Sequence, residues 1–82
     1  MNYVYILRSV SYPDQFYTGL CSDVQARLAA HNAGQSPHTS KYKPWRLFSY
    51  HAFESRQTAA AFERYLKSGS GRAFALKHFR AR

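Results

Sequence analysis

Two short segments rich in tyrosine, at residues 3–8 and 15–20, constrain the fold of this chain more than any other feature. Both have the composition of β-strands, and the Pro13-Asp14 pair between them favours a hairpin turn. Because side chains alternate between the two faces of a strand, a suitable register brings Tyr5 and Tyr17 to a common surface. Both faces of the first segment are apolar, so we expect a sheet that is at least partly covered on both sides.

The remaining chain predicts helices and one further strand. Asp23 suits the N-cap of a helix, and Gly34 suits the left-handed residue that ends one. The expected elements are a helix at Val24–Ala33, a polar loop at Gln35–Pro44, a strand at Trp45–Phe53, a helix at about Arg56–Lys67 capped by Ser55, a break at Ser68-Gly69-Ser70-Gly71 and a short helix from Arg72 to about Arg80. The order β-β-α-β-α-α predicts an α+β fold with a small sheet, in a single domain spanning residues 1–82.

Polar side chains interrupt the apolar stripes of the two longer predicted helices. In the first, His31 falls within the stripe and Arg27 at its edge, so both can face the tyrosine surface. In the second, Glu63 lies in the same sector as the apolar residues. Burying an ionised carboxylate costs several kcal/mol unless a cation compensates. That cation is either a basic side chain, with Arg27 the structural alternative, or a divalent metal ion.

These residue types suit phosphodiester chemistry. The chain has only four acidic residues, too few for the converging carboxylates of a two-metal nuclease. If it cleaves phosphodiesters, we expect it to use one ion, Mg²⁺ or Mn²⁺, held by one carboxylate, water and substrate oxygens. A tyrosine is a poor base at its ordinary pKa, but a neighbouring positive charge lowers that pKa and His31 can accept the phenolic proton. The Arg27 guanidinium can bind a non-bridging phosphate oxygen. Packing alone remains the alternative for either tyrosine taken singly.

The formal net charge of +8 favours a polyanionic partner, either nucleic acid or an anionic membrane surface. Solubility alone is the bland alternative. Lys41, Tyr42 and Lys43 form a basic and aromatic cluster that can stack on an unpaired base or pack at a strand end. We expect these three residues, together with Lys67 and Arg72, to bind nucleic acid.

The sequence also favours a cytoplasmic location. Cys21 cannot form an internal disulfide, because the chain has one cysteine, and we expect it to be a small buried or half-buried residue. No apolar run approaches the roughly 20 residues of a membrane span. The N-terminal residues lack the layout of a signal peptide.

The ordered motifs of the chain resemble those of the GIY-YIG nuclease domains, in particular small free-standing bacterial members related to the N-terminal domain of an excision-repair endonuclease. The resemblance runs from Tyr3 to about Phe79 and rests on four segments: Tyr3-Val4-Tyr5, Tyr17-Thr18-Gly19, Asp23-Val24-Gln25-Ala26-Arg27-Leu28-Ala29-Ala30-His31-Asn32 and Phe62-Glu63-Arg64-Tyr65-Leu66-Lys67. It implies a small three-stranded antiparallel sheet flanked by helices. The chain departs from the family in lacking the asparagine that many members carry after the metal-binding helix.

The resemblance implies metal-dependent endonuclease activity on DNA, selective for DNA structure rather than sequence, in repair or recombination. Tyr5 would activate or orient the attacking water and His31 would assist its deprotonation. Tyr17 would position the phosphate, Arg27 would stabilise the charge of the transition state, and Glu63 would hold the ion. Two alternatives remain open: a nucleic-acid-binding module with weak or no catalytic activity, and a small adaptor for a protein partner.

Overall fold

The computed structural model describes residues 1–80, and the last two residues of the expected domain lie outside the described residues. The elements are β1 (Asn2–Ser9), β2 (Phe16–Cys21), α1 (Val24–Asn32), α2 (Pro37–Ser40), β3 (Trp45–Phe53), α3 (Arg56–Lys67), α4 (Gly69–Ala75) and a π-helical segment (Leu76–Arg80). The predicted strands and the two longer helices are confirmed, as is the α+β fold.

The strands form one antiparallel sheet in the order β2-β1-β3. The central strand, β1, pairs with both neighbours, and Tyr5 lies opposite Gly19 on β2 and Tyr50 on β3. A register shift between Ile6 and Leu7 interrupts the pairing of β1 with β3. Since β2 has a strand on one side only, its outer edge is available to other parts of the molecule and to a ligand.

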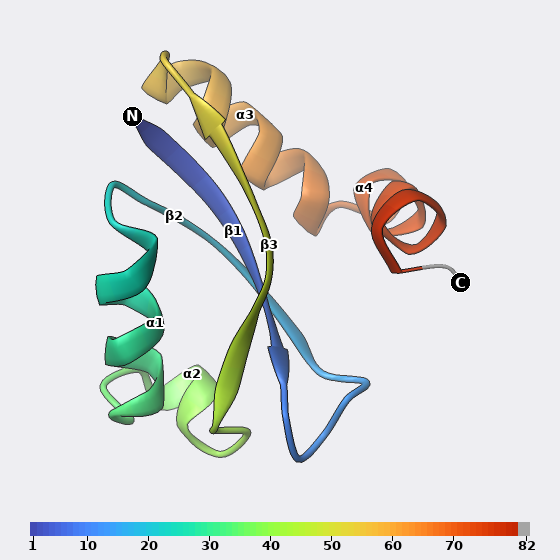
Figure 1. Ribbon diagram of the computed structural model, residues 1–82. Helices are drawn as coiled ribbons and strands as arrows, with labels where there is room; N and C mark the ends of the chain where they lie inside the picture. Colours follow the sequence, from blue (N-terminus) through green and yellow to red (C-terminus); the bar gives the residue numbers. More distant parts are fainter. Residues whose placement is uncertain (81–82) are drawn as a thin grey trace.

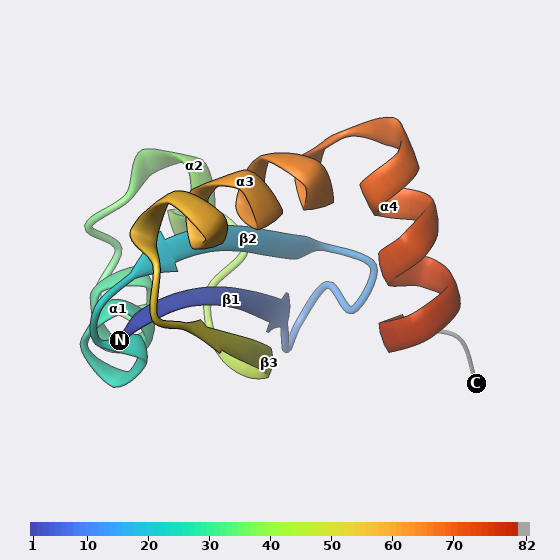
Figure 2. The same cartoon turned by 90° about the horizontal axis from the view of Figure 1, so that it is seen from above.

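Helices cover both faces of this sheet, as the apolar composition of β1 predicts. Val4 and Ile6 pack under α3 and α4, whereas Tyr5 and Leu7 pack with α1 on the opposite face. Figure 1 shows α1 and α2 on one side of the twisted strands and α3 and α4 on the other. Seen from above, α3 runs along the sheet and α4 stands beyond its end (Figure 2). The sheet therefore separates two small cores.

Side-chain caps fix the ends of the helices. Asp23 accepts a hydrogen bond from the Ala26 amide at 3.0 Å, and Ser55 accepts one from the Thr58 amide at 3.2 Å. Gly34 follows α1 with φ of +77°, the left-handed conformation that favours glycine. These three predicted helix boundaries are confirmed. Within residues 1–80, no helix combines the length and the apolarity that crossing a membrane requires.

Two predicted elements were wrong in detail. The predicted loop at Gln35–Pro44 contains the short helix α2, which begins at Pro37, a residue whose fixed φ suits the first turn of a helix. The predicted break at residues 68–71 is only Ser68, which ends α3 and caps α4. Glycine is needed within α4, because a Cβ at Gly71 would overlap the carbonyl group of Tyr65 at the end of α3.

Candidate active site

Three rings from three elements meet on the face of the sheet that α1 covers. The Tyr5 hydroxyl lies 3.0 Å from His31 Nε2. The Tyr17 ring lies 4.8 Å from the His31 ring and 6.2 Å from the Tyr5 ring, measured between centroids. Tyr5 and His31 are buried, with 1% and 3% of their surface exposed, whereas Tyr17 is half-buried. Tyr17 is therefore the ring of the three that a ligand reaches most easily.

A chain of hydrogen bonds continues from His31 into α2. His31 Nδ1 lies 2.8 Å from the Thr39 hydroxyl, which donates to the Ser36 carbonyl at 3.5 Å. We assign the imidazole proton to Nδ1, because the Thr39 hydroxyl has the Ser36 carbonyl as its own acceptor and can then accept from Nδ1. Nε2 is left without a proton and accepts the hydrogen bond from Tyr5. The direction of donation runs from Tyr5 through His31 and Thr39 to the backbone.

Burial dominates the ionisation of both buried groups. It raises the pKa of Tyr5, with the nearby Tyr17 acting in the same direction, and these effects outweigh the lowering influence of Arg27. The expectation that neighbouring positive charge would lower the pKa of the active tyrosine was wrong for Tyr5, since its hydroxyl is almost out of solvent. Burial and then the Arg27 charge lower the pKa of His31. At neutral pH the pair consists of a phenol and a neutral imidazole.

Gly19 makes room for the Tyr5 ring. It faces Tyr5 across the β1–β2 pair, and an added Cβ would overlap the outer atoms of that ring, lying 2.7 Å from Cε1. Glycine inside a strand is the sequence signal of such a close approach. The third residue of the Tyr17-Thr18-Gly19 motif thus sets where the Tyr5 hydroxyl lies.

Arg27 and Glu63 approach the rings from different helices. Arg27 is exposed on α1 and lines a hollow with Asp23 and Cys21. After burial and Tyr17, the Arg27 charge lowers the pKa of Tyr5 and the Glu63 charge raises it, so both charges act on that hydroxyl. The structure thus brings Tyr5, Tyr17 and His31 together, whereas the link of Arg27 and Glu63 to them is the influence of their charges on the Tyr5 hydroxyl.

Glu63 pairs with a lysine in this structure. Its Oε2 lies 2.6 Å from Lys67 Nζ, one helical turn further along α3, and 17% of the Glu63 side chain is exposed. The alternative of a Glu63–Arg27 ion pair was therefore wrong. Lys67 Nζ also lies 5.8 Å from the centre of the Tyr17 ring. The Lys67 ammonium thus contacts the Glu63 carboxylate and also lies near the Tyr17 ring.

The carboxylate near the rings suits a divalent cation such as Mg²⁺ that keeps most of its water ligands. Within residues 1–80, no three His, Cys, Asp or Glu side chains gather as a metal site. Mg²⁺ commonly binds through one or two carboxylates while keeping several waters and taking substrate phosphate oxygens. Glu63, a half-buried carboxylate whose side chain is 17% exposed, fits that mode of binding.

The predicted nucleic-acid-binding residues fall into two groups. Lys67 and Arg72 line a cavity together with Tyr17, next to the ring cluster. Lys41 Nζ lies 5.4 Å from the centre of the Tyr42 ring, and Lys43 is exposed beside it. Tyr42 packs edge-on against both Tyr12 and Trp45, at 5.4 Å and 6.4 Å between ring centroids. Tyr42 therefore contributes to packing as well as to the basic surface.

The residues that fix the position of His31 were not predicted from the sequence. Thr39 is 2% exposed, and its carbonyl accepts from Trp45 Nε1 at 2.9 Å. Asn32 follows His31, and its side-chain amide donates to the Trp45 carbonyl and accepts from the Trp45 backbone N–H. These two hydrogen bonds connect the end of α1 to β3. A threonine in a polar loop carries no sequence signal for this contact, because the contact depends on the path of the loop.

Comparisons with known proteins cover nearly the whole chain. The family model described as the GIY-YIG catalytic domain matches residues 1–77. A UPF0213 protein of Streptococcus pyogenes serotype M3 is 34% identical over 77 residues, or 93% of this chain and 82% of that protein. A UPF0213 protein of serotype M5 is 32% identical with the same coverage. The solution NMR structure of a UPF0213 protein from Bacillus halodurans matches with a TM-score of 0.54 and 32% identity, covering 94% of this chain and 84% of that one.

Proposed function

Because this chain belongs to the family of GIY-YIG catalytic domains, which are nuclease domains, we propose that it is a divalent-metal-dependent endonuclease that hydrolyses DNA. The proposal includes selectivity for DNA structure rather than sequence, a role in repair or recombination, and a cytoplasmic location. The observation that carries it is the directed hydrogen bond from Tyr5 to a neutral His31, beside Tyr17 and within reach of the Arg27 and Glu63 charges. Phenol and imidazole in this order form a path along which water can lose a proton.

Tyr5 and His31 together would act as the general base. The Tyr5 oxygen accepts a hydrogen bond from the attacking water, while its own proton points at His31 Nε2. Because burial raises the pKa of Tyr5, the phenol keeps its proton until His31 takes it. The water oxygen then bonds to phosphorus as its proton moves to Tyr5, and the proton of Tyr5 moves to Nε2. This transfer needs no free phenolate. The bond between phosphorus and the departing oxygen breaks, and that oxygen takes its proton from solvent water.

Thr39 and Arg27 would limit the cost of this transfer. Once Nε2 is protonated, the Nδ1 proton becomes a stronger donor to the Thr39 hydroxyl at 2.8 Å. Arg27 is exposed on α1, and its guanidinium would bind a non-bridging oxygen of the reacting phosphate. Tyr17, the half-buried ring of the cluster, would donate a hydrogen bond to the same phosphate.

Glu63 would hold one Mg²⁺ or Mn²⁺ ion, with water and phosphate oxygens as the other ligands. The bound ion would supply Lewis-acid stabilisation of the negative charge on the phosphate and the departing oxygen. The Lys67 ammonium forms an ion pair with the Glu63 carboxylate in this structure. When DNA binds, it would leave this carboxylate and bind a DNA phosphate. Exchange of one cation for another keeps the half-buried Glu63 charge compensated throughout.

A binding module without catalysis is the second candidate function. The net charge of +8 supports it, since a basic domain of this size binds polyanions whether or not it cuts them. Charge alone does not require a buried phenol–imidazole pair. The two candidates therefore differ in what the removal of the Tyr5 hydroxyl does.

The test compares cleavage of branched and linear DNA by wild type, Glu63→Gln and Tyr5→Phe, with Mg²⁺ or Mn²⁺ present. Glu54→Gln and Tyr50→Phe are matched controls, because both residues are exposed and neither belongs to the ring cluster. We expect the first two variants to lose cutting by about 100-fold or more while DNA affinity and its steep salt dependence persist. Equal residual cutting in wild type and Glu63→Gln would identify a contaminating nuclease and favour the binding module.

A further inference from the structure

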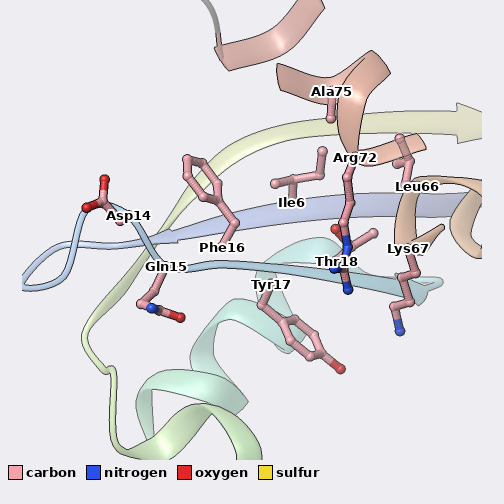
Figure 3. A pocket seen from close by; sticks show the side chains of 10 residues that line it. All are labelled: Ile6, Asp14, Gln15, Phe16, Tyr17, Thr18, Leu66, Lys67, Arg72 and Ala75. Atoms are coloured by element: carbon pink, nitrogen blue, oxygen red, sulfur yellow. The ribbon is translucent and has the colours of Figure 1, made fainter. Parts of the chain in front are cut away.

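A cavity of about 510 Å³ opens along the outer edge of β2, directly beside the ring cluster. Tyr17 lines it and also packs against His31, so the cavity adjoins the place where the phosphate would react. Figure 3 shows the Lys67 and Arg72 side chains extending from their helices toward β2, where Thr18 and Tyr17 lie. The catalytic residues proposed above, apart from Tyr17, do not line it.

The cavity has a basic side. Arg72 is exposed on α4, and within residues 1–80 its guanidinium forms no hydrogen bond or ion pair. Lys67 supplies a second cation, shared with Glu63 at 2.6 Å. An arginine without a protein partner, placed beside a lysine on a cavity wall, suits a phosphate group.

The rest of the cavity suits a base. Ile6 on β1, Leu66 on α3 and Ala75 on α4 form its apolar wall. At the hairpin end, Asp14 and Gln15 add a carboxylate and an amide that match the polar edge of a base. A volume near 510 Å³ falls in the range of pockets that enclose small ligands, about 300–1,000 Å³. A simple anion would use only the basic side.

We propose that this cavity binds one unpaired nucleotide next to the phosphodiester bond that is cut. Its phosphate would lie at Arg72 and Lys67, and its base against the apolar wall. A paired base stays in its stack and cannot enter, whereas an unpaired base swings out at little cost. The inference rests on the proposed function and narrows its substrate to DNA with an unpaired nucleotide at the cut, such as a bulge or a flap.

The first test measures binding alone, without metal or cleavage. Deoxycytidine 5′-monophosphate is titrated into the full chain while backbone amide signals are followed by NMR. We expect shifts centred on Thr18, Leu66 and Ala75, and affinity about tenfold above that for inorganic phosphate or deoxycytidine, because each of these has only half of the contacts. Affinity equal to that of inorganic phosphate, or equal displacement by polyglutamate, would overturn the proposal.

Variants locate the binding. Arg72→Ala should weaken the binding of deoxycytidine 5′-monophosphate by about tenfold, and Arg72→Lys by less, because a charge-assisted hydrogen bond is lost or replaced. Arg46→Ala removes the same charge from an exposed position on β3, outside the cavity lining, and should change nothing beyond the small effect of net charge. Equal weakening in Arg72→Ala and Arg46→Ala would contradict a specific site.

Cleavage then separates this proposal from the proposed function. Wild type should cut a duplex with one unpaired cytidine faster than a fully paired duplex, and an abasic site at the unpaired position should remove most of that gain. Tyr5→Phe should bind the nucleotide as wild type does and yet cut neither duplex. Cutting that ignores the unpaired base refutes the cavity proposal alone, whereas nucleotide binding without any cutting refutes the nuclease alone.

Discussion

Replacing Gly19 by alanine tests the packing that places the Tyr5 hydroxyl. The added Cβ would lie 2.7 Å from Tyr5 Cε1 and closer still to Cζ and the hydroxyl oxygen, whereas ordinary contacts begin near 3.4 Å. Tyr5 is 1% exposed, so its ring has no free space to enter. We expect the ring to be displaced and its hydrogen bond to His31 to break.

The magnitude follows from two losses. Overpacking a well-packed core costs about 1–3 kcal/mol, and losing a buried hydrogen bond adds about 1 kcal/mol. The free energy of unfolding should therefore fall by about 2–4 kcal/mol, a large fraction of the roughly 5–15 kcal/mol typical of a domain. The melting temperature should fall by about 10 °C or more. Cleavage should fall as far as it does in Tyr5→Phe.

The assay is urea denaturation of Gly19→Ala beside Gly69→Ala, with cleavage measured on the same samples. Gly69 has no atom within 4 Å of an added Cβ and lies in the first turn of α4, so its alanine variant should be stabilised by about 0.4–1 kcal/mol. Tyr5→Phe keeps the clashing ring atoms Cζ and Cε1 but lacks the hydroxyl and its hydrogen bond, and Tyr5→Leu removes the ring. In a double-mutant cycle, the overpacking part of the cost of Gly19→Ala should therefore persist in Tyr5→Phe and shrink in Tyr5→Leu.

Two results would refute this reasoning. Wild-type stability and cleavage in Gly19→Ala would mean that the Tyr5 ring is not confined as described. An unchanged cost of Gly19→Ala in Tyr5→Leu would place the strain in the backbone of β2 instead of the ring.

The other predictions concern the hydrogen-bond chain and pH. Thr39→Val should lower kcat by about tenfold or more with little change in KM, and Thr39→Ser should restore it, because only a hydroxyl accepts the Nδ1 proton of His31; equal defects in both variants would contradict a hydrogen-bonding role. The cleavage rate should fall as the pH is lowered, because the imidazolium form of His31 cannot take the phenolic proton. The midpoint should lie below the ordinary histidine pKa of 6.5, since burial and Arg27 lower the pKa of His31. A midpoint above 6.5 in single-turnover assays would contradict this role of His31. Stability should also fall as the pH drops below 6.5, because the unfolded chain binds protons that buried His31 and half-buried His51 do not bind. Urea midpoints should show that His51→Gln reduces this loss whereas His38→Gln, at an exposed position, does not.

Local patterns were enough to predict most of the fold. Strand alternation placed Tyr5 and Tyr17 on one surface, and the helical period directed His31 toward it. The caps Asp23 and Ser55 predicted where the helices begin, because capping depends on a few adjacent residues. In each case the relevant interactions lie within one element or between neighbouring strands.

Features that depend on the path of the whole chain could not be read from the sequence. The helix α2 has four residues, too few for a hydrophobic period. Gly71 looked like a helix breaker, but its lack of a side chain allows α4 to approach α3. Lys67 stands four residues after Glu63, a visible pairing distance, yet the choice between it and Arg27 needed the three-dimensional arrangement.

The depth of burial was equally inaccessible. Whether Arg27 or desolvation controls the pKa of Tyr5 depends on how completely the surrounding groups cover its hydroxyl. In the structure, burial raises the pKa of Tyr5 although Arg27 acts to lower it, so Tyr5 is a phenol beside His31. The same holds for Thr39, which was predicted to lie in a polar loop but is buried and contacts the His31 ring.

Paramagnetic broadening by Mn²⁺ can show whether Glu63 holds an ion near the tyrosines, because it locates a bound cation without requiring activity. Added to the full chain, Mn²⁺ should broaden the NMR signals of Glu63, Tyr17 and Tyr5 first. The effect should vanish in Glu63→Gln and persist in Glu54→Gln. Broadening centred on Asp14 or Asp23 instead, or unchanged in Glu63→Gln, would contradict a single site in which Glu63 holds the ion beside the tyrosines.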